Sequence, residues 1–118
     1  MDNDAVTPQA ILAPHGVATW TRCDGMSRVL EVAQDTTYFT FTGHPATQGL
    51  GPIESENDQG LIVHSALAIT TDGVPLGIVA QKIWTRDPAA LDKSGRRRQT
   101  PIKDKESYRW IETARAVA

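Results

Sequence analysis

The sequence predicts an α/β domain in which a three-stranded, mostly antiparallel sheet has one helix before it and one after it. The main observation is a hairpin pattern, in which two apolar runs over residues 61–71 and 74–84 flank the pair Asp72-Gly73. Asp-Gly between apolar runs is a strong signal for antiparallel pairing. A shorter run rich in β-branched residues at 28–34 predicts an earlier strand, and both ends of the domain show helical spacing.

A helix is predicted over about residues 14–24. Val17, Trp20 and Cys23 recur at helical spacing, with polar residues between them. Pro14 would lie in the first turn, where proline is tolerated because its missing N–H would be unpaired anyway. Cys23 is expected to be a small buried hydrophobe rather than a catalytic thiol, since no supporting motif surrounds it.

A second helix is predicted over residues 101–118. Trp110 and Val117 fall on one face of this segment. Pro101 suits a first turn, with Thr100 as a candidate N-cap. The order of elements is therefore helix, strand, long loop, hairpin, basic loop and helix.

The composition fits one ordinary domain. The chain has 118 residues, of which 40% are hydrophobic and 22% charged. We expect residues 1–10 to form a disordered leader and residues 11–118 to form the domain. One cysteine excludes an internal disulfide and favours the cytoplasm. No run approaches the ~20 apolar residues of a membrane span, so no membrane partner is predicted.

A carboxylate follows the first predicted strand. Residues 28–34 read as a buried strand that ends at Asp35, and residues 37–41 could extend it or pair beside it. A strand end can hold a carboxylate rigidly, and carboxylate oxygens suit Mg²⁺ or Mn²⁺. The alternative is that Asp35 turns the chain, helped by the hydroxyls of Thr36 and Thr37.

The charge is unevenly distributed. Residues 1–72 carry two basic and nine acidic residues, for a net −7, whereas residues 73–118 carry ten basic and five acidic residues, for a net +5. This suits a metal-dependent enzyme acting on phosphates, and equally two solvated faces. The candidate phosphate contacts are Arg96, Arg97, Arg98 and Lys105, together with Lys93 and Lys103; a solvated loop is the alternative.

Three other side chains have a plainer interpretation. His64 lies in the middle of a predicted strand and is expected to be a core histidine bonded to a neighbour rather than a metal ligand. Trp84 and Trp110 are expected to be core or rim aromatics rather than base-stacking platforms. The stretch from Gly43 to Gly60, with four glycines and two prolines, predicts a long loop.

Four segments, in order, resemble the catalytic core of cut-and-paste DDE transposases of bacterial insertion sequences. VAQDTT (residues 32–37) is similar to the strand that bears the first aspartate, and HPATQGLGPI (44–53) to the glycine-rich loop after it. Residues 60–86 resemble the following hairpin, and KESYRW (105–110) the start of the next helix. The resemblance covers most of the predicted domain and rests on the combination and order of these pieces.

The resemblance implies an RNase H-like fold with an Asp-Asp-Glu triad that binds two divalent ions, Mg²⁺ or Mn²⁺, for phosphodiester cleavage and strand transfer on the DNA of transposon ends. Asp35 would be the first member. The chain ends at Ala118, before the other two, so we expect an incomplete core, inactive alone. Asp58, Asp72 and Asp87 lie in predicted loops or turns and do not replace them.

Two other interpretations stay open. The chain could be a non-catalytic module that binds DNA or a full-length transposase and acts as an inhibitor. It could also be an unrelated small α/β protein. In the transposase reading, one sheet edge lacks its usual partner strand, which favours self-association.

Overall fold

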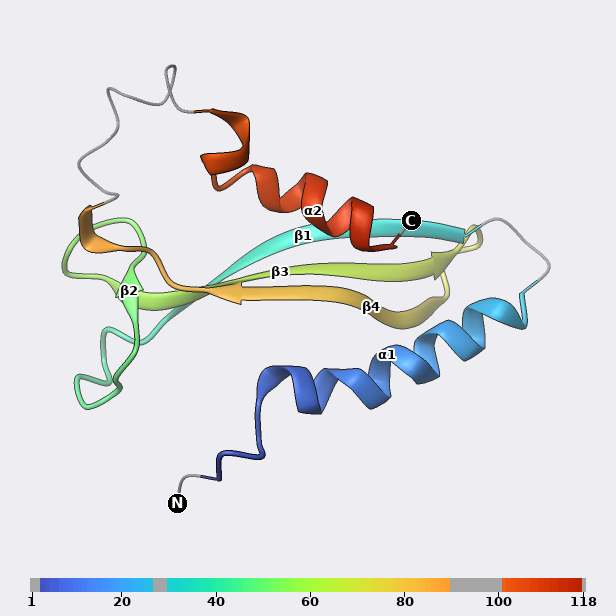
Figure 1. Ribbon diagram of the computed structural model, residues 1–118, viewed down its shortest axis with the longest axis horizontal. Helices are drawn as coiled ribbons and strands as arrows, with labels where there is room; N and C mark the ends of the chain where they lie inside the picture. Colours follow the sequence, from blue (N-terminus) through green and yellow to red (C-terminus); the bar gives the residue numbers. More distant parts are fainter. Residues whose placement is uncertain (1–2, 27–29, 90–100, 118) are drawn as a thin grey trace.

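The computed structural model describes residues 3–26, 30–89 and 101–117 (Figure 1). These residues form an α/β arrangement in which one helix precedes and one follows an antiparallel sheet along the chain, which confirms the predicted fold class. The elements in chain order are α1 (Pro8–Asp24), β1 (Leu30–Thr40), β2 (Gly51–Pro52), β3 (Gln59–Thr70), β4 (Pro75–Trp84), the 3-10 helix η2 (Ile102–Asp104) and α2 (Tyr108–Val117).

The strand β3 is the centre of the sheet. It pairs antiparallel with β1 along one side and with β4 along the other. Gly60 pairs with Thr40 of β1 and with Gly51 of β2, so β2 lies on the same side of β3 as β4. The predicted hairpin is thus confirmed, and its turn uses Gly73 at a φ of 89°, a backbone conformation that glycine adopts readily.

The first helix is longer than predicted. It begins at Pro8, and the hydroxyl of Thr7 accepts a hydrogen bond from the N–H of Ala10 at 3.0 Å, which caps the first turn. The prediction that the helix starts near Pro14 was wrong, because Pro14 lies inside the helix and Pro8 occupies the favoured first-turn position. The last three residues of the predicted leader therefore belong to α1.

The strand β1 is also longer than predicted, since the two runs at 28–34 and 37–41 join into one strand of 11 residues. Asp35 pairs with Ser65 in the middle of this strand. The prediction that Asp35 ends the strand was wrong, and so is the alternative that it turns the chain. Both erred because the polar residues around Asp35 interrupt the apolar pattern without interrupting the ladder.

The predicted C-terminal helix is divided. Pro101 precedes the single turn η2, and α2 begins only at Tyr108. The expected start at Pro101 was therefore wrong, while Thr100 lies outside the described residues. The predicted long loop is interrupted by β2, whose two residues pair with the start of β3.

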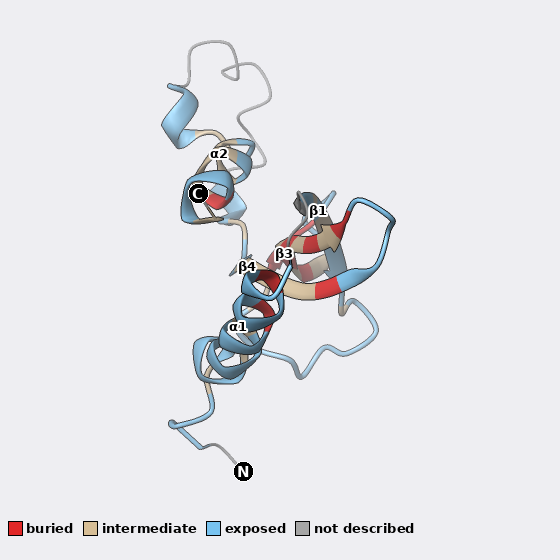
Figure 2. Ribbon diagram, turned by 90° about the vertical axis from the view of Figure 1, so that its right-hand side faces the viewer, coloured by how far each residue is buried: buried red, intermediate tan, exposed pale blue. Residues whose placement is uncertain are grey.

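Burial follows the alternation of β3. Residues at even positions of this strand are buried and those at odd positions are partly exposed. On α1, Cys23 packs with Ala68 and Leu76, with Val79 beside them, so the expectation of a buried hydrophobe is confirmed. Figure 2 shows the buried residues concentrated in the sheet and where the two helices meet it. No helix among the described residues is long and apolar enough to cross a membrane.

Candidate functional site

Asp35 lies on the sheet face opposite to α2. Successive side chains of a strand point to opposite faces. Its neighbours Gln34 and Thr36 both contact His64, whose ring lies against Trp110 of α2. Asp35, between them, therefore points the other way, and its side chain is exposed.

A polar row crosses the sheet at this position. Asp35 pairs with Ser65 of β3, which in turn pairs with Gln81 of β4. The side-chain amide of Gln81 donates to the hydroxyl of Ser65 at 2.9 Å. The row therefore offers one carboxylate and neutral oxygens, a set that can take a hard cation such as Mg²⁺ or Mn²⁺ but holds it weakly.

The three carboxylates that were not expected to complete the site, Asp58, Asp72 and Asp87, lie in loops or turns. Asp58 accepts from the hydroxyl of Ser55 at 3.1 Å, and Asp87 accepts from the N–H of Ala89 at 2.9 Å. Asp72 lies in the hairpin turn. Within the described part of the chain, no group of three or more His, Cys, Asp or Glu side chains is placed to hold a metal ion.

On the opposite face, His64 is fully buried and bonded at both ring nitrogens. Its Nε2 lies 2.9 Å from Oε1 of Gln34, an atom that can only accept, so Nε2 carries the hydrogen. The hydroxyl of Thr36 then donates to Nδ1 at 2.8 Å. The expectation of a core histidine bonded to its neighbours is confirmed. Gln34 and Thr36 were missed as its partners, although their positions on either side of Asp35 could have indicated a shared face.

This environment lowers the pKa of His64 below its ordinary value of 6.5. Burial is the larger cause, because it disfavours the charged imidazolium, and the negative charge of Asp35 opposes it. The ring of Trp110 lies over His64 with 4.7 Å between the ring centroids. His64 therefore links β1, β3 and α2 in its neutral form.

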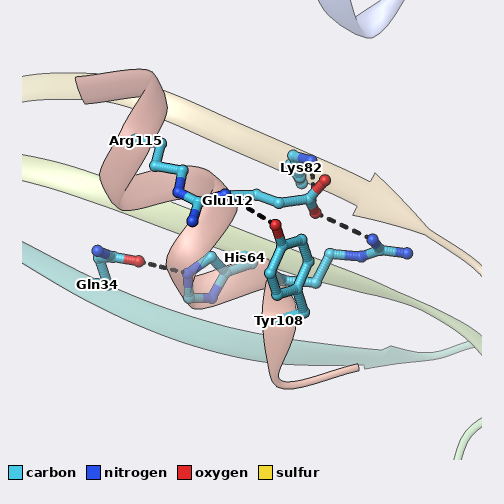
Figure 3. Close-up of polar contacts among 7 residues, drawn as sticks. Gln34, His64, Lys82, Tyr108, Glu112 and Arg115 are labelled. Carbon is cyan, nitrogen blue, oxygen red and sulfur yellow. Dashed lines mark hydrogen bonds and ion pairs between the residues drawn. The ribbon is translucent and has the colours of Figure 1, made fainter. Parts of the chain in front are cut away.

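Charged side chains of α2 continue this contact toward β4, as Figure 3 shows. Glu112 bridges Lys82 at 2.8 Å and Arg109 at 3.1 Å. The guanidinium of Arg109 lies 5.2 Å from the ring centroid of Trp84. These contacts lower the pKa of Glu112, with Lys82 as the larger cause and Arg109 as the smaller. Trp84 thus packs at the rim of the sheet beneath α2.

A second link to the C-terminal segment was not predicted. The guanidinium of Arg86 forms two parallel hydrogen bonds of 2.8 Å with Glu106 and also donates to the carbonyl of Ile53. It lies 5.5 Å from the ring centroid of Tyr38 on β1. The bond to Glu106 is the main cause that raises the pKa of Arg86.

Only two of the predicted phosphate contacts, Lys103 and Lys105, lie among the described residues. Lys105 lies between η2 and α2 and is half-buried, while Lys103 is exposed on η2. The remaining basic residues, Lys93 and the run Arg96, Arg97 and Arg98, lie outside the described residues. Contact with DNA therefore stays a prediction.

Comparison with known proteins adds no family. A scan of the chain against protein-family models finds no match, and a search of the curated proteins finds no match either.

Proposed function

We propose that this chain is the N-terminal part of the catalytic core of a DDE transposase, a cytoplasmic enzyme of DNA transposition, with Asp35 as its first metal-binding carboxylate. The observation that carries the proposal is the position of Asp35, exposed at the centre of β1 and paired directly with the hairpin β3–β4. The four-segment resemblance supports it, and so does the strand arrangement: the RNase H-like core that the resemblance implies begins with three antiparallel strands, and here β3 lies between β1 and β4.

The proposed chemistry needs more than Asp35. A two-metal site places its ions ~3.5–4 Å apart and contacts both the attacking and the leaving oxygen. The polypeptide of residues 1–118 supplies one of the three carboxylates that the resemblance implies. We therefore propose that it carries out neither phosphodiester hydrolysis nor strand transfer alone, and that Arg96, Arg97, Arg98 and Lys105 contact the phosphates of transposon-end DNA.

Calorimetric titration with Mn²⁺ and Mg²⁺ tests the metal role. Wild type is expected to bind with a dissociation constant of about millimolar or weaker, since one carboxylate leaves the ion mostly hydrated. Asp35→Asn should abolish this binding. Glu31→Gln, which removes another exposed carboxylate from the same face of β1, should retain it. Micromolar binding, or loss in the control alone, would refute the proposed site.

A second candidate function is a non-catalytic module that binds a full-length transposase and inhibits it. It is favoured by the side of β1 facing away from β3, since β1 pairs with β3 alone among the described strands. The nucleotide sequence beyond the codon for Ala118 discriminates the two candidates. A frame that encodes a further strand with an aspartate, then a helix with a glutamate, favours the catalytic core; its absence favours the module.

A further inference from the structure

The outer side of β1 presents a row of backbone hydrogen-bonding groups. Just after the strand, the N–H of Phe41 donates to the carbonyl of Gln59 at 2.8 Å, and the carbonyl of Phe39 lies against Gly60. In an antiparallel pair, residues that face the partner strand alternate with residues that face away. Odd-numbered residues of β1 therefore bond to β3, and the even-numbered ones, from Val32 to Tyr38, point their N–H and C=O groups outward.

Among the described residues no segment covers this edge, and β1 carries no proline, lysine or bulge, although Glu31 and Asp35 add charge to it. Natural edges carry lysine, proline or bulges, or are covered by another segment. The pairing of β1 with β3 runs over 11 residue pairs with no irregularity, and the strand contains neither proline nor a basic residue. Val32, Tyr38 and Phe39 are exposed large hydrophobic residues on it. An incoming strand would thus find both free backbone groups and apolar contacts.

The charge of β1 selects among incoming strands. Glu31 and Asp35 are exposed on the same face, and no positive charge on β1 offsets them. Opposite charges on neighbouring strands stabilise a sheet, whereas like charges destabilise it. A second copy of β1 would add two more carboxylates to this face, while a strand with lysine or arginine at alternate positions would neutralise them.

We propose that the outer edge of β1 binds an extended segment of a partner protein by β-strand addition, with basic side chains placed next to Glu31 and Asp35. The backbone groups of Val32, Gln34, Thr36 and Tyr38 supply the hydrogen bonds, and the two carboxylates select the charge. This inference deepens the second candidate function by naming the chemistry of its partner. It does not depend on metal binding by Asp35, so either can fail without the other.

The first experiment uses a fluorescein-labelled peptide of alternating valine and lysine, followed by fluorescence anisotropy at about 0.15 M salt, where long-range attraction is screened. The same peptide with a fully N-methylated backbone keeps its charge but cannot pair. We expect it to bind at least about tenfold more weakly. A valine-glutamate peptide should also bind more weakly. Equal binding of the first two peptides would mean simple charge attraction and would overturn the proposal.

Variants of the protein locate the site. Val32→Pro removes an outward N–H and leaves the odd-numbered ladder to β3 intact, so peptide affinity should fall about tenfold while circular dichroism stays the same. Glu31→Gln and Asp35→Asn should each weaken binding about two- to fivefold. The matched control Glu54→Gln, in the loop after β2, should not change it.

Two further measurements keep the test decisive should Val32→Pro fail to fold. Amide shifts of the wild type on adding peptide should concentrate on β1; shifts on α1 or α2 instead would place the site elsewhere and overturn the proposal. Sedimentation should give a monomer. A stable dimer that Val32→Lys disrupts would show that a second copy occupies the edge, which also overturns it.

Discussion

The two edges of the sheet are built in opposite ways. Along β4, the helix α1 lies beside the strand (Figure 1). Its side chains bond the outer backbone of β4: Nε2 of His15 accepts from the N–H of Ile78 at 3.0 Å, and Nε of Arg22 donates to the carbonyl of Leu76 at 2.6 Å. The β3–β4 pairing also has two irregularities. Along β1 there is neither an irregularity nor a described covering segment.

The β4 edge contributes mainly to the stability of the fold, whereas the β1 edge is available for interactions. The covered edge depends on Gly77, whose φ of 140° and missing side chain let α1 approach the strand. The residues of the covered edge therefore act mainly in the packing of α1 against β4. The open edge carries the exposed carboxylates and the proposed metal position, and substitutions there should change binding more than folding.

The largest expected effect comes from Gly77→Ala on the covered edge. A Cβ at this position would meet the hydroxyl of Thr19 and would lie 3.0 Å from Nη2 of Arg22 and 3.1 Å from Nε2 of His15. With the strained φ added, we expect the free energy of unfolding in urea to fall by about 3 kcal/mol. The matched control is Gly16→Ala on α1, where nothing lies within 4 Å; it should gain about 0.5–1 kcal/mol. A neutral Gly77→Ala would mean that α1 does not hold this edge.

The next largest effect is expected for His64→Ala, which removes a buried side chain that contacts β1. It empties a fully buried position and removes two side-chain hydrogen bonds, so unfolding free energy should fall by about 2–3 kcal/mol at pH 7. The loss should also free Trp110 from its ring contact and change its fluorescence. Unchanged fluorescence would argue against the contact between α2 and the sheet.

The same residue predicts a pH dependence. Because the folded-state pKa of His64 lies below 6.5, the unfolded state binds more protons between these two values. The stability contribution is therefore complete above pH 6.5 and is lost as pH falls through the folded pKa. Denaturation of wild type between pH 5 and 8 should show this slope, and His64→Asn should flatten it there. An equal slope in both proteins would assign it to other groups.

A smaller effect is expected for Arg86→Ala, which releases Glu106 and the carbonyl of Ile53. The parallel bonds are charge-assisted but partly solvated, so the loss should be about 1–2 kcal/mol. Arg115→Ala, whose guanidinium bonds the hydroxyl of Tyr108 on the exposed side of α2, is the control and should cost only a few tenths of a kcal/mol. Similar losses in both variants would contradict the anchoring role of Arg86.

Glu112→Gln should have the smallest effect, because its partners Lys82 and Arg109 are half-exposed and salt screens such pairs. The lowered pKa of Glu112 means that its contribution is present above the unfolded value of about 4.5 and is lost as pH falls through the folded pKa. The difference from wild type should shrink in acid and in 0.5 M salt. A difference that persists in both would indicate a packing role instead.

The hairpin could be predicted from the sequence, but which edge of the sheet is covered by a helix could not. Two apolar runs around Asp72-Gly73 are a local signal, and local signals determined β3 and β4. The start of α1 was predicted wrongly from Pro14, because a proline can lie inside a helix that tertiary packing stabilises. Whether a strand edge is covered depends on segments distant in sequence, such as His15 against Ile78. The sheet face on which Asp35 lies could be assigned only from the contacts of Gln34 and Thr36 with His64 in the structure.

Metal binding by Asp35 on β1 can be located directly through the line broadening of backbone amides by Mn²⁺ at about millimolar concentration. We expect broadening centred on Asp35 and its partner Ser65, abolished in Asp35→Asn and preserved in Glu31→Gln. Broadening that centres on Asp58 or Asp87, or that survives in Asp35→Asn, would contradict it.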